Sequence, residues 1–272
     1  MPRTMACSGS TRRFALGLAA AAVVGVVGCA SETDEGLDSA ESAALVDNAL
    51  TANALTANAL TANALTANAL TANALTANAL TANALTANGL RDPLAREFLK
   101  YVVSCALDDH DELAFRIDGR LYKFPGSLGL APDWGDKHGS CDGECQRWVS
   151  ACVLARVDFT GTKRTISIRG DNPALQPEAN ELRKFSDREA TYYGNVFIRD
   201  QPRFLCLSPG MTSDERVCGP SLSSCPMTVE GSCDDACAHV GRYGAFADCS
   251  DRGRAGRGTV YHETITVFLP DQ

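Results

Sequence analysis

The sequence predicts an α+β fold, held together by disulfide bonds, for residues 91–272 of a chain of 272 residues. Two observations predict this class. The segment mixes stretches of helical periodicity with stretches of strand-like alternation, and it lacks the regular strand–helix–strand order of a parallel α/β sheet. It also holds ten of the twelve cysteines. An even number of cysteines indicates a framework of disulfides if the chain is exported.

The first 28 residues have the pattern of an export signal. They contain Arg3, Arg12 and Arg13, no acidic residue, and an apolar run over residues 14–28. This run is shorter than the ~20 residues that a membrane-spanning helix needs, whereas a basic head before a short apolar run is typical of a signal peptide. Residues 10–16 also resemble a twin-arginine signal. Displaced hydrophobic positions favour the general secretory route, and both routes stay open.

The apolar run ends in Val26-Val27-Gly28-Cys29, which resembles the lipobox of bacterial lipoprotein precursors. The resemblance implies that Cys29 becomes the acylated first residue of the mature chain and attaches it to a membrane. Each buried CH2 of such an anchor contributes ~0.8 kcal/mol. Ala30 stands where that family commonly has Asp in proteins kept at the inner membrane, so the resemblance implies the cell envelope and its outer membrane. The alternative is an ordinary secretory signal in which Cys29 is incidental.

Residues 29–47 form an acidic linker, and residues 48–90 repeat the unit Asn-Ala-Leu-Thr-Ala. The linker has no basic or aromatic residue, which predicts disorder. In the repeat a leucine stands at every fifth position, from Leu45 to Leu90. A helix would wind these leucines around its axis by about 140° per unit, and a flat strand would alternate them between its faces. A disordered spacer with a reach of ~36 Å is therefore favoured.

A square solenoid is the alternative for the repeat, because one unit on each side would point every leucine toward the axis. This arrangement resembles the pentapeptide-repeat family in its leucine period and its Asn/Ala/Thr content. The resemblance implies a short β-solenoid, and an irregular or helical rod is a third interpretation. Partner binding by the repeat itself is a further hypothesis.

The elements of the C-terminal domain follow from local patterns. Residues 95–107 have helical periodicity, and residues 112–124 read as a hairpin with Asp118-Gly119 at its turn. A loop rich in Gly and Pro follows over residues 125–134. Residues 141–157 are the longest predicted helix, with Trp148, Cys152 and Leu154 facing inward.

Further along the chain the signals are shorter. Residues 165–169 are strand-like, and residues 260–269 predict a terminal strand. Ser186, with Glu189 three positions later, has the pattern of a capping box before a short helix that ends at Tyr193.

The cysteines of the domain predict five disulfide bonds, each contributing ~2–4 kcal/mol, but their spacing does not give the connectivity. They are Cys105, Cys141, Cys145, Cys152, Cys206, Cys218, Cys225, Cys233, Cys237 and Cys249. Residues 139–145 resemble residues 231–237, which suggests either an internal duplication or two ordinary helix starts. If Cys141 and Cys145 share a helix, we expect each to bond a different partner. A zinc site on the C-x3-C pairs is disfavoured, because exported thiolates oxidise, so neither a metal site nor a cofactor is expected.

Three segments, residues 98–105, 124–132 and 147–152, are similar to those of an uncharacterised group of cysteine-rich exported proteins of bacteria. The resemblance extends over much of residues 91–272. It implies export, but it implies no activity.

Four histidines remain as candidates for chemistry, since Gly-x-Ser-x-Gly, His-Glu-x-x-His and Walker motifs are absent. His110 lies in a run of acidic residues that reads as a solvated turn, with calcium or zinc binding as the alternative. His138 follows Asp133 and Asp136 and is a candidate general base near a cleft. His262 adjoins Glu263, although neighbours on a strand point to opposite faces. His239 has no evident partner.

Aromatic side chains offer a further candidate site. Trp134, Tyr192, Tyr193 and Tyr243 would form a ligand platform if they were exposed together. Packing in the core is the competing interpretation, and it is favoured.

The predicted function is that of a non-catalytic lipoprotein of the cell envelope, which acts in binding or in structure. The net charge of −8 argues against nucleic acid as a partner. The membrane is the expected partner, through the lipid on Cys29, and no catalytic residue is assigned. The alternative is a secreted hydrolase of unrecognised type, for which Asp133, Asp136 and His138 are the first residues to consider.

Overall fold

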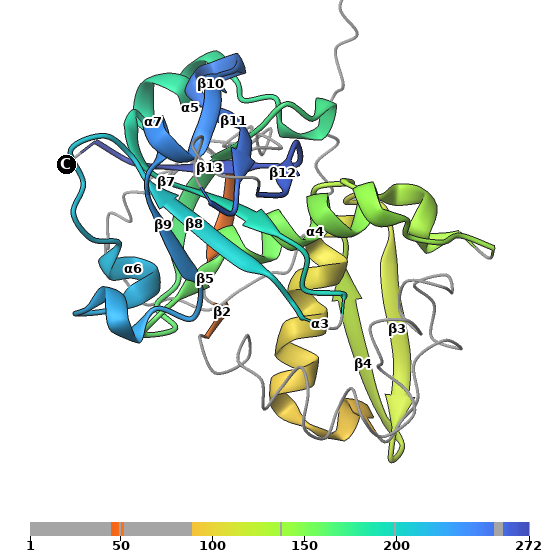
Figure 1. Cartoon of the computed structure of the whole chain (residues 1–272). Coiled ribbons are helices and arrows are strands. Elements are labelled where there is room, and N and C mark those ends of the chain that lie inside the picture. Colours follow the sequence, from red (N-terminus) through yellow and green to blue (C-terminus); the bar gives the residue numbers. More distant parts are fainter. Residues whose placement is uncertain are drawn as a thin grey trace, which may run out of the picture. The chain divides into compact units, whose positions relative to one another are not determined.

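The computed structural model describes residues 45–48, 50–51, 89–136, 138–198, 200–252 and 258–271 (Figure 1). The predicted export signal, the acylation of Cys29 and most of the five-residue repeat lie outside these residues. The described residues form helices and four β-sheets, with disulfide bonds between them. The predicted α+β, disulfide-bonded domain is confirmed.

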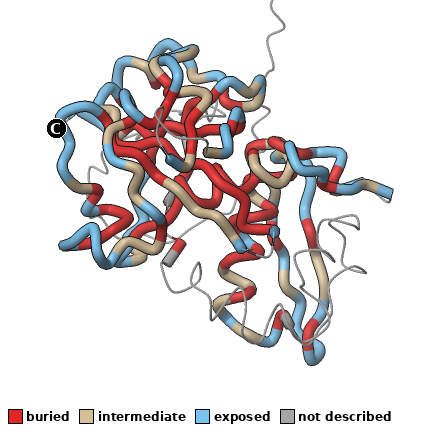
Figure 2. Tube along the Cα trace, in the orientation of Figure 1, coloured by how far each residue is buried: buried red, intermediate tan, exposed pale blue. Residues whose placement is uncertain are grey.

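A six-stranded sheet forms the centre of the domain, in the order β1-β6-β13-β7-β8-β9. All its pairings are antiparallel except the parallel pair of β8 and β9. The residues of the inner strands are mostly buried, as the red colour of the tube in Figure 2 shows. In chain order the strands are β1 (Leu45–Asn48), β6 (Arg164–Arg169), β7 (Asp187–Gly194), β8 (Arg203–Leu207), β9 (Thr228–Ser232) and β13 (Ile265–Leu269).

Two helices pack together beside this sheet, and α4 lies against β7 and β13. Helix α3 (Pro93–Ala106) begins where the side chain of Asp92 accepts a hydrogen bond from the Leu94 amide, with proline at the first helical position. Helix α4 (Gly143–Ala155) begins where the side chain of Asp142 accepts a hydrogen bond from the Cys145 amide. The two predicted helices are confirmed, each with slightly different ends.

A β-hairpin packs against α3, through contacts between α3 and strand β4. Its strands are β3 (Glu112–Ile117) and β4 (Arg120–Pro125). The two turn residues, Asp118 and Gly119, have φ values of 50° and 82°. Positive φ at both positions fits a tight hairpin turn, in which Asp and Gly are favoured. The predicted hairpin and its turn are confirmed.

A smaller three-stranded sheet, in the order β10-β11-β12, follows β9 along the chain. Its strands are β10 (Cys237–Val240), β11 (Phe246–Ser250) and β12 (Val260–Tyr261). The remaining elements are short: β2 (Leu50–Thr51), β5 (Val157–Asp158), α5 (Ala179–Lys184), α6 (Glu215–Cys218), α7 (Cys233–Ala236), and 3-10 turns at Gly89–Arg91, Pro132–Gly135, Pro173–Leu175, Leu222–Ser224 and Arg242–Gly244.

Residues 45–48 and 50–51 belong to the folded domain, although they precede it in the predicted organisation. Strand β1 pairs with β6 at the edge of the large sheet, and β2 pairs with β5 in parallel. Val46 and Leu50 are buried, and the Leu50 amide donates to the carbonyl of Arg156 at 3.1 Å. Leu90 is fully buried in the same hydrophobic core. The boundaries placed at residues 47/48 and 90/91 therefore do not mark the limits of the domain.

One of the predicted elements is wrong, and a second is divided in two. The capping box at Ser186 precedes no helix, because residues 187–194 form β7, which lies inside the sheet between β13 and β8. The run of β-branched and aromatic residues, Thr191-Tyr192-Tyr193, suits a buried strand and outweighs the local helix signal. The terminal strand at residues 260–269 is divided in two, because residues 262–264 cross from the small sheet to the large one.

All ten cysteines of residues 91–272 are paired. The bonds are Cys105–Cys152, Cys141–Cys145, Cys206–Cys233, Cys218–Cys225 and Cys237–Cys249. The expectation that Cys141 and Cys145 bond different partners is wrong, because α4 starts at Gly143 and leaves Cys141 in the preceding loop. Their Cα atoms lie 5.2 Å apart, within the usual range for a disulfide.

The connectivity also bears on the suggested duplication. In the first of the two similar segments, the two cysteines bond each other. In the second segment, Cys233 and Cys237 bond Cys206 and Cys249. The different bonding argues for two ordinary helix starts rather than repeated units.

A buried polar cluster connects α6 to the sheet and to the end of α4. The guanidinium of Arg216 donates to both carboxylate oxygens of Glu189, at 2.6–3.0 Å, and to the carbonyl of Val157. The Tyr192 hydroxyl accepts from Arg216 and donates to Asp214. Burial raises the pKa of Glu189 to about 7, although the charge of Arg216 opposes this shift. Arg216 thus compensates several buried acceptors at one point in the core.

Candidate functional site

Two cavities are described at the surface of the domain. One, of about 350 Å³, is here named the histidine pocket. It is lined by Glu144, Trp148, Asp171, Asn172, Pro173, His239, Ala247, Asp248, His262 and Glu263. Six of these ten residues are acidic or histidine, which makes this cavity the strongest candidate for a functional site.

The small sheet brings the two histidines of the pocket together. His239 lies on β10, directly opposite Ala247 on β11, and His262 follows β12. The disulfide between Cys237 and Cys249 crosses the same strand pair, where these two residues face each other. The backbone positions that carry His239 and Asp248 are therefore held by both pairing and a covalent bond.

Asp248 lies between the two histidines. Its Oδ1 is 2.6 Å from Nδ1 of His262, and its Oδ2 is 3.5 Å from Nδ1 of His239. The backbone at Asp248 has a φ of 55°, a left-handed conformation that aspartate tolerates better than most residues. A hydrogen bond from Nδ1 to a carboxylate fixes the imidazole tautomer, so that Nε2 carries the free lone pair. The arrangement therefore suits His262 to accept a proton or to bind a metal ion.

One wall of the pocket is an ion pair. Arg147 on α4 donates two hydrogen bonds to the buried carboxylate of Glu263, at 2.6 and 2.8 Å. Hydrogen bonding to Glu263 raises the pKa of Arg147. This pairing also fixes the segment that crosses between the two sheets, beside His262. The positive charge of Arg147 compensates the negative charge of Glu263. Glu263 therefore stabilises the wall of the pocket and contributes little net charge to it.

Two exposed carboxylates complete the rim. Glu144 lies in the first turn of α4, and Asp171 follows β6. The neighbour of Asp171, Gly170, lies so close to the crossing segment that a Cβ there would be 2.6 Å from the carbonyl oxygen of Thr264. A side chain at residue 170 would therefore displace the backbone at Thr264, two residues after His262. Glu144 and Asp171 give the pocket a negative edge.

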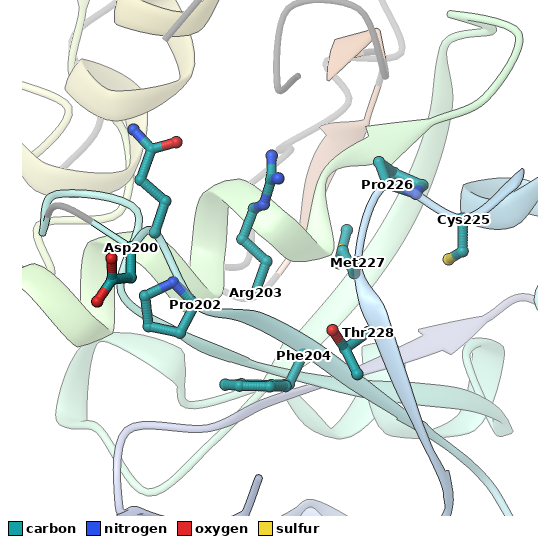
Figure 3. Close-up of a pocket in the computed structure, with 9 residues that line it drawn as sticks. Asp200, Pro202, Arg203, Phe204, Cys225, Pro226, Met227 and Thr228 are labelled. Atoms are coloured by element: carbon teal, nitrogen blue, oxygen red, sulfur yellow. The ribbon is translucent and has the colours of Figure 1, made fainter. Parts of the chain in front are cut away.

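The second cavity, of about 370 Å³, lies at the start of β8 (Figure 3). It is lined by Asp200, Gln201, Pro202, Arg203, Phe204, Cys225, Pro226, Met227 and Thr228. Burial lowers the pKa of Arg203. Arg203 and Phe204 are consecutive on the strand and point in different directions in Figure 3. This cavity has one acidic and one basic side chain and contains no histidine, so it offers less chemistry than the histidine pocket.

The structure does not bring the predicted catalytic candidates into a cavity. Asp133, Asp136 and His138 are exposed, and none of them lines either of the two cavities. His110 is also exposed and lies 3.4 Å from Asp109, an arrangement that suits the solvated turn. The positions of these four residues therefore give no support to a catalytic role.

The proposed aromatic platform is likewise not formed. Trp134, Tyr192 and Tyr193 are fully buried, and only Tyr243 is exposed. Trp134 packs edge-to-face against Phe197 with ring centroids 5.8 Å apart. Core packing is therefore the role of the three buried rings.

Three cysteine sulfurs lie within 4.8 Å of one another, at Cys206, Cys233 and Cys237. This distance would suit a metal ion, but each sulfur is bonded in a disulfide. A disulfide sulfur has no thiolate to offer a metal. The three cysteines therefore stabilise the fold.

Sequence reasoning considered His239 and His262 singly, and it missed Asp248. The three residues lie 9 and 14 positions apart along the chain, and this spacing carries no motif. The signal that connects them is the pairing of Cys237 with Cys249, which places His239 beside the strand that carries Asp248. The sequence does not give the disulfide connectivity, so this signal could not be used.

Comparisons with known protein families, with curated proteins and with solved structures give no match to this chain. Among the residues that the structure describes, none of the helices has the length and apolar character needed to cross a membrane.

Proposed function

We propose that the protein is an exported, lipid-anchored binding module of the cell envelope, with the histidine pocket as its ligand site. The observation that carries the proposal is the complete pairing of the ten cysteines of the domain. Disulfides persist in oxidising compartments outside the cytosol and are rare inside it. The lipobox-like residues before Cys29 supply the means of attachment.

The position of β1 limits how far the anchor can lie from the domain. Fifteen residues separate Cys29 from Leu45, the first residue of β1. Whatever their conformation, a stretch of this length spans at most about 55 Å. The domain would therefore stay close to the membrane surface, and the length of the repeat would not alter this distance.

Binding is favoured over catalysis by the lining of the pocket. None of its ten lining residues has a hydroxyl or thiol side chain that could serve as a nucleophile. Two histidines around a carboxylate, with a negative rim, suit recognition of a cation. The ligand class proposed for the pocket is therefore a cation or a ligand with cationic groups.

Cell fractionation with a lipid label tests the anchor. The wild-type chain should carry a radioactive acyl group and sediment with membranes, whereas Cys29→Ala should be unlabelled and soluble. Cys7→Ala is the matched control, because Cys7 lies in the leader and should leave labelling unchanged. Equal membrane attachment of the Cys29→Ala variant, or free thiols in the domain after isolation, would contradict the proposal.

A secreted hydrolase is the second candidate, and the close hydrogen bond between His262 and Asp248 favours it. An imidazole oriented by a carboxylate can act as a general base toward water. A panel of chromogenic esters, peptides and glycosides tests this candidate. Hydrolysis that is lost in His262→Ala and retained in His138→Ala would replace the binding function with catalysis.

A further inference from the structure

We propose that two neighbouring disulfides of the domain exchange partners in the presence of a small thiol. They are Cys206–Cys233 and Cys237–Cys249. In the exchanged form Cys237 is bonded to Cys206, which detaches β10 from β11 beside the histidine pocket. The inference goes beyond the proposed function, because it rests on the contacts of the disulfides and not on the ligand of the pocket or on the membrane anchor.

The two disulfides touch each other. The Sγ atoms of Cys206 and Cys237 lie 3.6 Å apart, a separation at which two non-bonded sulfur atoms are in van der Waals contact. Cys233 completes a group of three sulfurs that all lie within 4.8 Å of one another. Among the residues that the structure describes, this is the only such group of cysteine sulfurs. Cys237 therefore has a second sulfur partner close by, whereas no third sulfur joins the other three disulfides in this way.

The exchange consists of ordinary thiol–disulfide steps. The thiolate of an external thiol attacks Sγ of Cys249, so the bond to Cys237 breaks and its electron pair stays on Cys237 as a thiolate. This thiolate attacks Sγ of Cys206 and forms a new bond, while Cys233 leaves as a thiolate that takes a proton from water. A second external thiol releases Cys249 from its mixed disulfide. The chain thus loses one disulfide, and two external thiols become one disulfide.

Two movements precede the bond changes. All four cysteines are buried, but β10 is an edge strand of the small sheet and its residues after Cys237 are exposed. Local opening of this strand admits the thiol. The attacking sulfur must also approach along the line of the bond that it breaks. Because Sγ of Cys237 lies within 4.8 Å of both sulfurs of Cys206–Cys233, it stands beside that bond, and it reaches the line by rotation about its own Cα–Cβ bond after Cys249 has been released.

Chain entropy does not oppose the exchange. Cys206 is separated by 27 residues from Cys233 and by 31 residues from Cys237. The cost of closing a loop grows only with the logarithm of its length, so the two alternative bonds constrain the unfolded chain almost equally. The populations of the two bonds should therefore lie within about tenfold of each other when Cys237 is a thiol.

The exchange alters the support of the histidine pocket. In the structure Cys237 faces Cys249 across the β10–β11 pair, and the bond between them holds His239 beside the strand of Asp248. In the exchanged form Cys237 is bonded to β8 instead, and only backbone hydrogen bonds keep β10 on β11. Amide hydrogen exchange along β10 should then be at least about tenfold faster, because the strand opens more easily.

A variant with an odd number of cysteines tests the exchange directly. The background is the full-length chain carrying Cys7→Ala and Cys29→Ala, which retains the ten cysteines of the domain. Cys249→Ala then leaves Cys237 as a thiol. The oxidised variant is incubated for hours at mildly alkaline pH, the timescale of uncatalysed exchange, and is then unfolded and labelled with N-ethylmaleimide at acidic pH. Mass spectrometry should find the label on both Cys237 and Cys233, in amounts within about tenfold of each other.

Cys237→Ala in the same background is the matched control. It removes the same disulfide but leaves the thiol on Cys249, which is not a member of the group of three sulfurs. Its label should stay on Cys249, with the Cys206–Cys233 bond intact. Label confined to Cys237 in the Cys249→Ala variant, or equal scrambling of bonds in the control, would overturn the proposal.

Partial reduction of the wild-type domain with dithiothreitol gives a second measurement, which decides the matter if circular dichroism shows that the variants do not fold. Chains in which Cys249 has become a thiol should contain the Cys206–Cys237 bond, and its absence from them would overturn the proposal. Failure of either test leaves the acyl labelling of Cys29 unaffected, because that is measured separately. The exchange and the proposed function can therefore fail independently.

Discussion

The disulfide bonds should differ in their contribution to stability, because they close loops of different length. Cys105–Cys152 joins α3 to α4 across a sequence separation of 47 residues, whereas Cys141–Cys145 spans a separation of 4. Chain entropy in the unfolded state predicts a loss of about 4 kcal/mol for the first bond and about 2 kcal/mol for the second. Cys105 and Cys152 are also fully buried between packed helices, so their removal costs packing in the same direction.

Urea unfolding of two double variants measures this difference. In Cys105→Ala/Cys152→Ala the free energy of unfolding should fall by about 2 kcal/mol more than in Cys141→Ala/Cys145→Ala. Both variants remove two cysteines and one bond, so each is the control for the other. Thiol titration should detect no free thiol in the domain of either variant. Equal losses, or a larger loss from the short loop, would refute the reasoning.

Three further changes probe the core. Arg216→Met should lower the free energy of unfolding in urea by about 3–5 kcal/mol, because it leaves the buried Glu189 without its partner; the exposed Arg242→Met should change it little. The folded protein, in which the pKa of Glu189 is about 7, retains a proton that the unfolded chain releases near pH 4.5. Stability measured against pH should therefore fall as the pH rises from about 4.5 to 7, and Glu189→Gln should remove this part of the dependence. Leu50→Ala should cost about 2–5 kcal/mol in the same urea assay, since Leu50 is fully buried. The exposed Leu121→Ala is its control, and an equal effect of the two would contradict the inclusion of β2 in the domain.

Local signals predicted the elements whose ends are determined by nearby residues. The hairpin β3–β4 turns at Asp118-Gly119, as predicted, whereas helix α3 was predicted from its periodicity alone, and its start at Asp92-Pro93 is a local signal that the prediction of residues 95–107 did not use. In both cases the side chains and backbone preferences that fix the element lie within a few residues of its end. These signals can be read from the sequence because they depend on neighbouring residues and not on contacts with distant ones.

The failures come from contacts between distant residues. Ser186 has a local helix signal, but the segment after it becomes β7, whose register with β8 and β13 buries Tyr192. Val46 and Leu50 looked like part of a featureless linker and repeat, yet Val46 is in register with Ile166 of β6. A five-residue period does not distinguish a leucine that meets the core from one that does not. The distinction depends on tertiary contacts, such as those of Leu50 beside β5 and of Leu90 in the core.

The candidate site could not be predicted for the same reason, because it also depends on contacts that the sequence alone does not give. The even count of cysteines predicted disulfides, but four cysteines alone allow three connectivities, and ten allow far more. One bond, Cys237–Cys249, decides whether His239 lies beside the strand of Asp248. The count of cysteines is a property of composition, whereas the site is a property of connectivity. A sequence can therefore predict that such a domain has disulfide bonds well before it indicates the chemistry of the domain, because the bonds follow from the number of cysteines whereas the pocket needs a particular pairing of them.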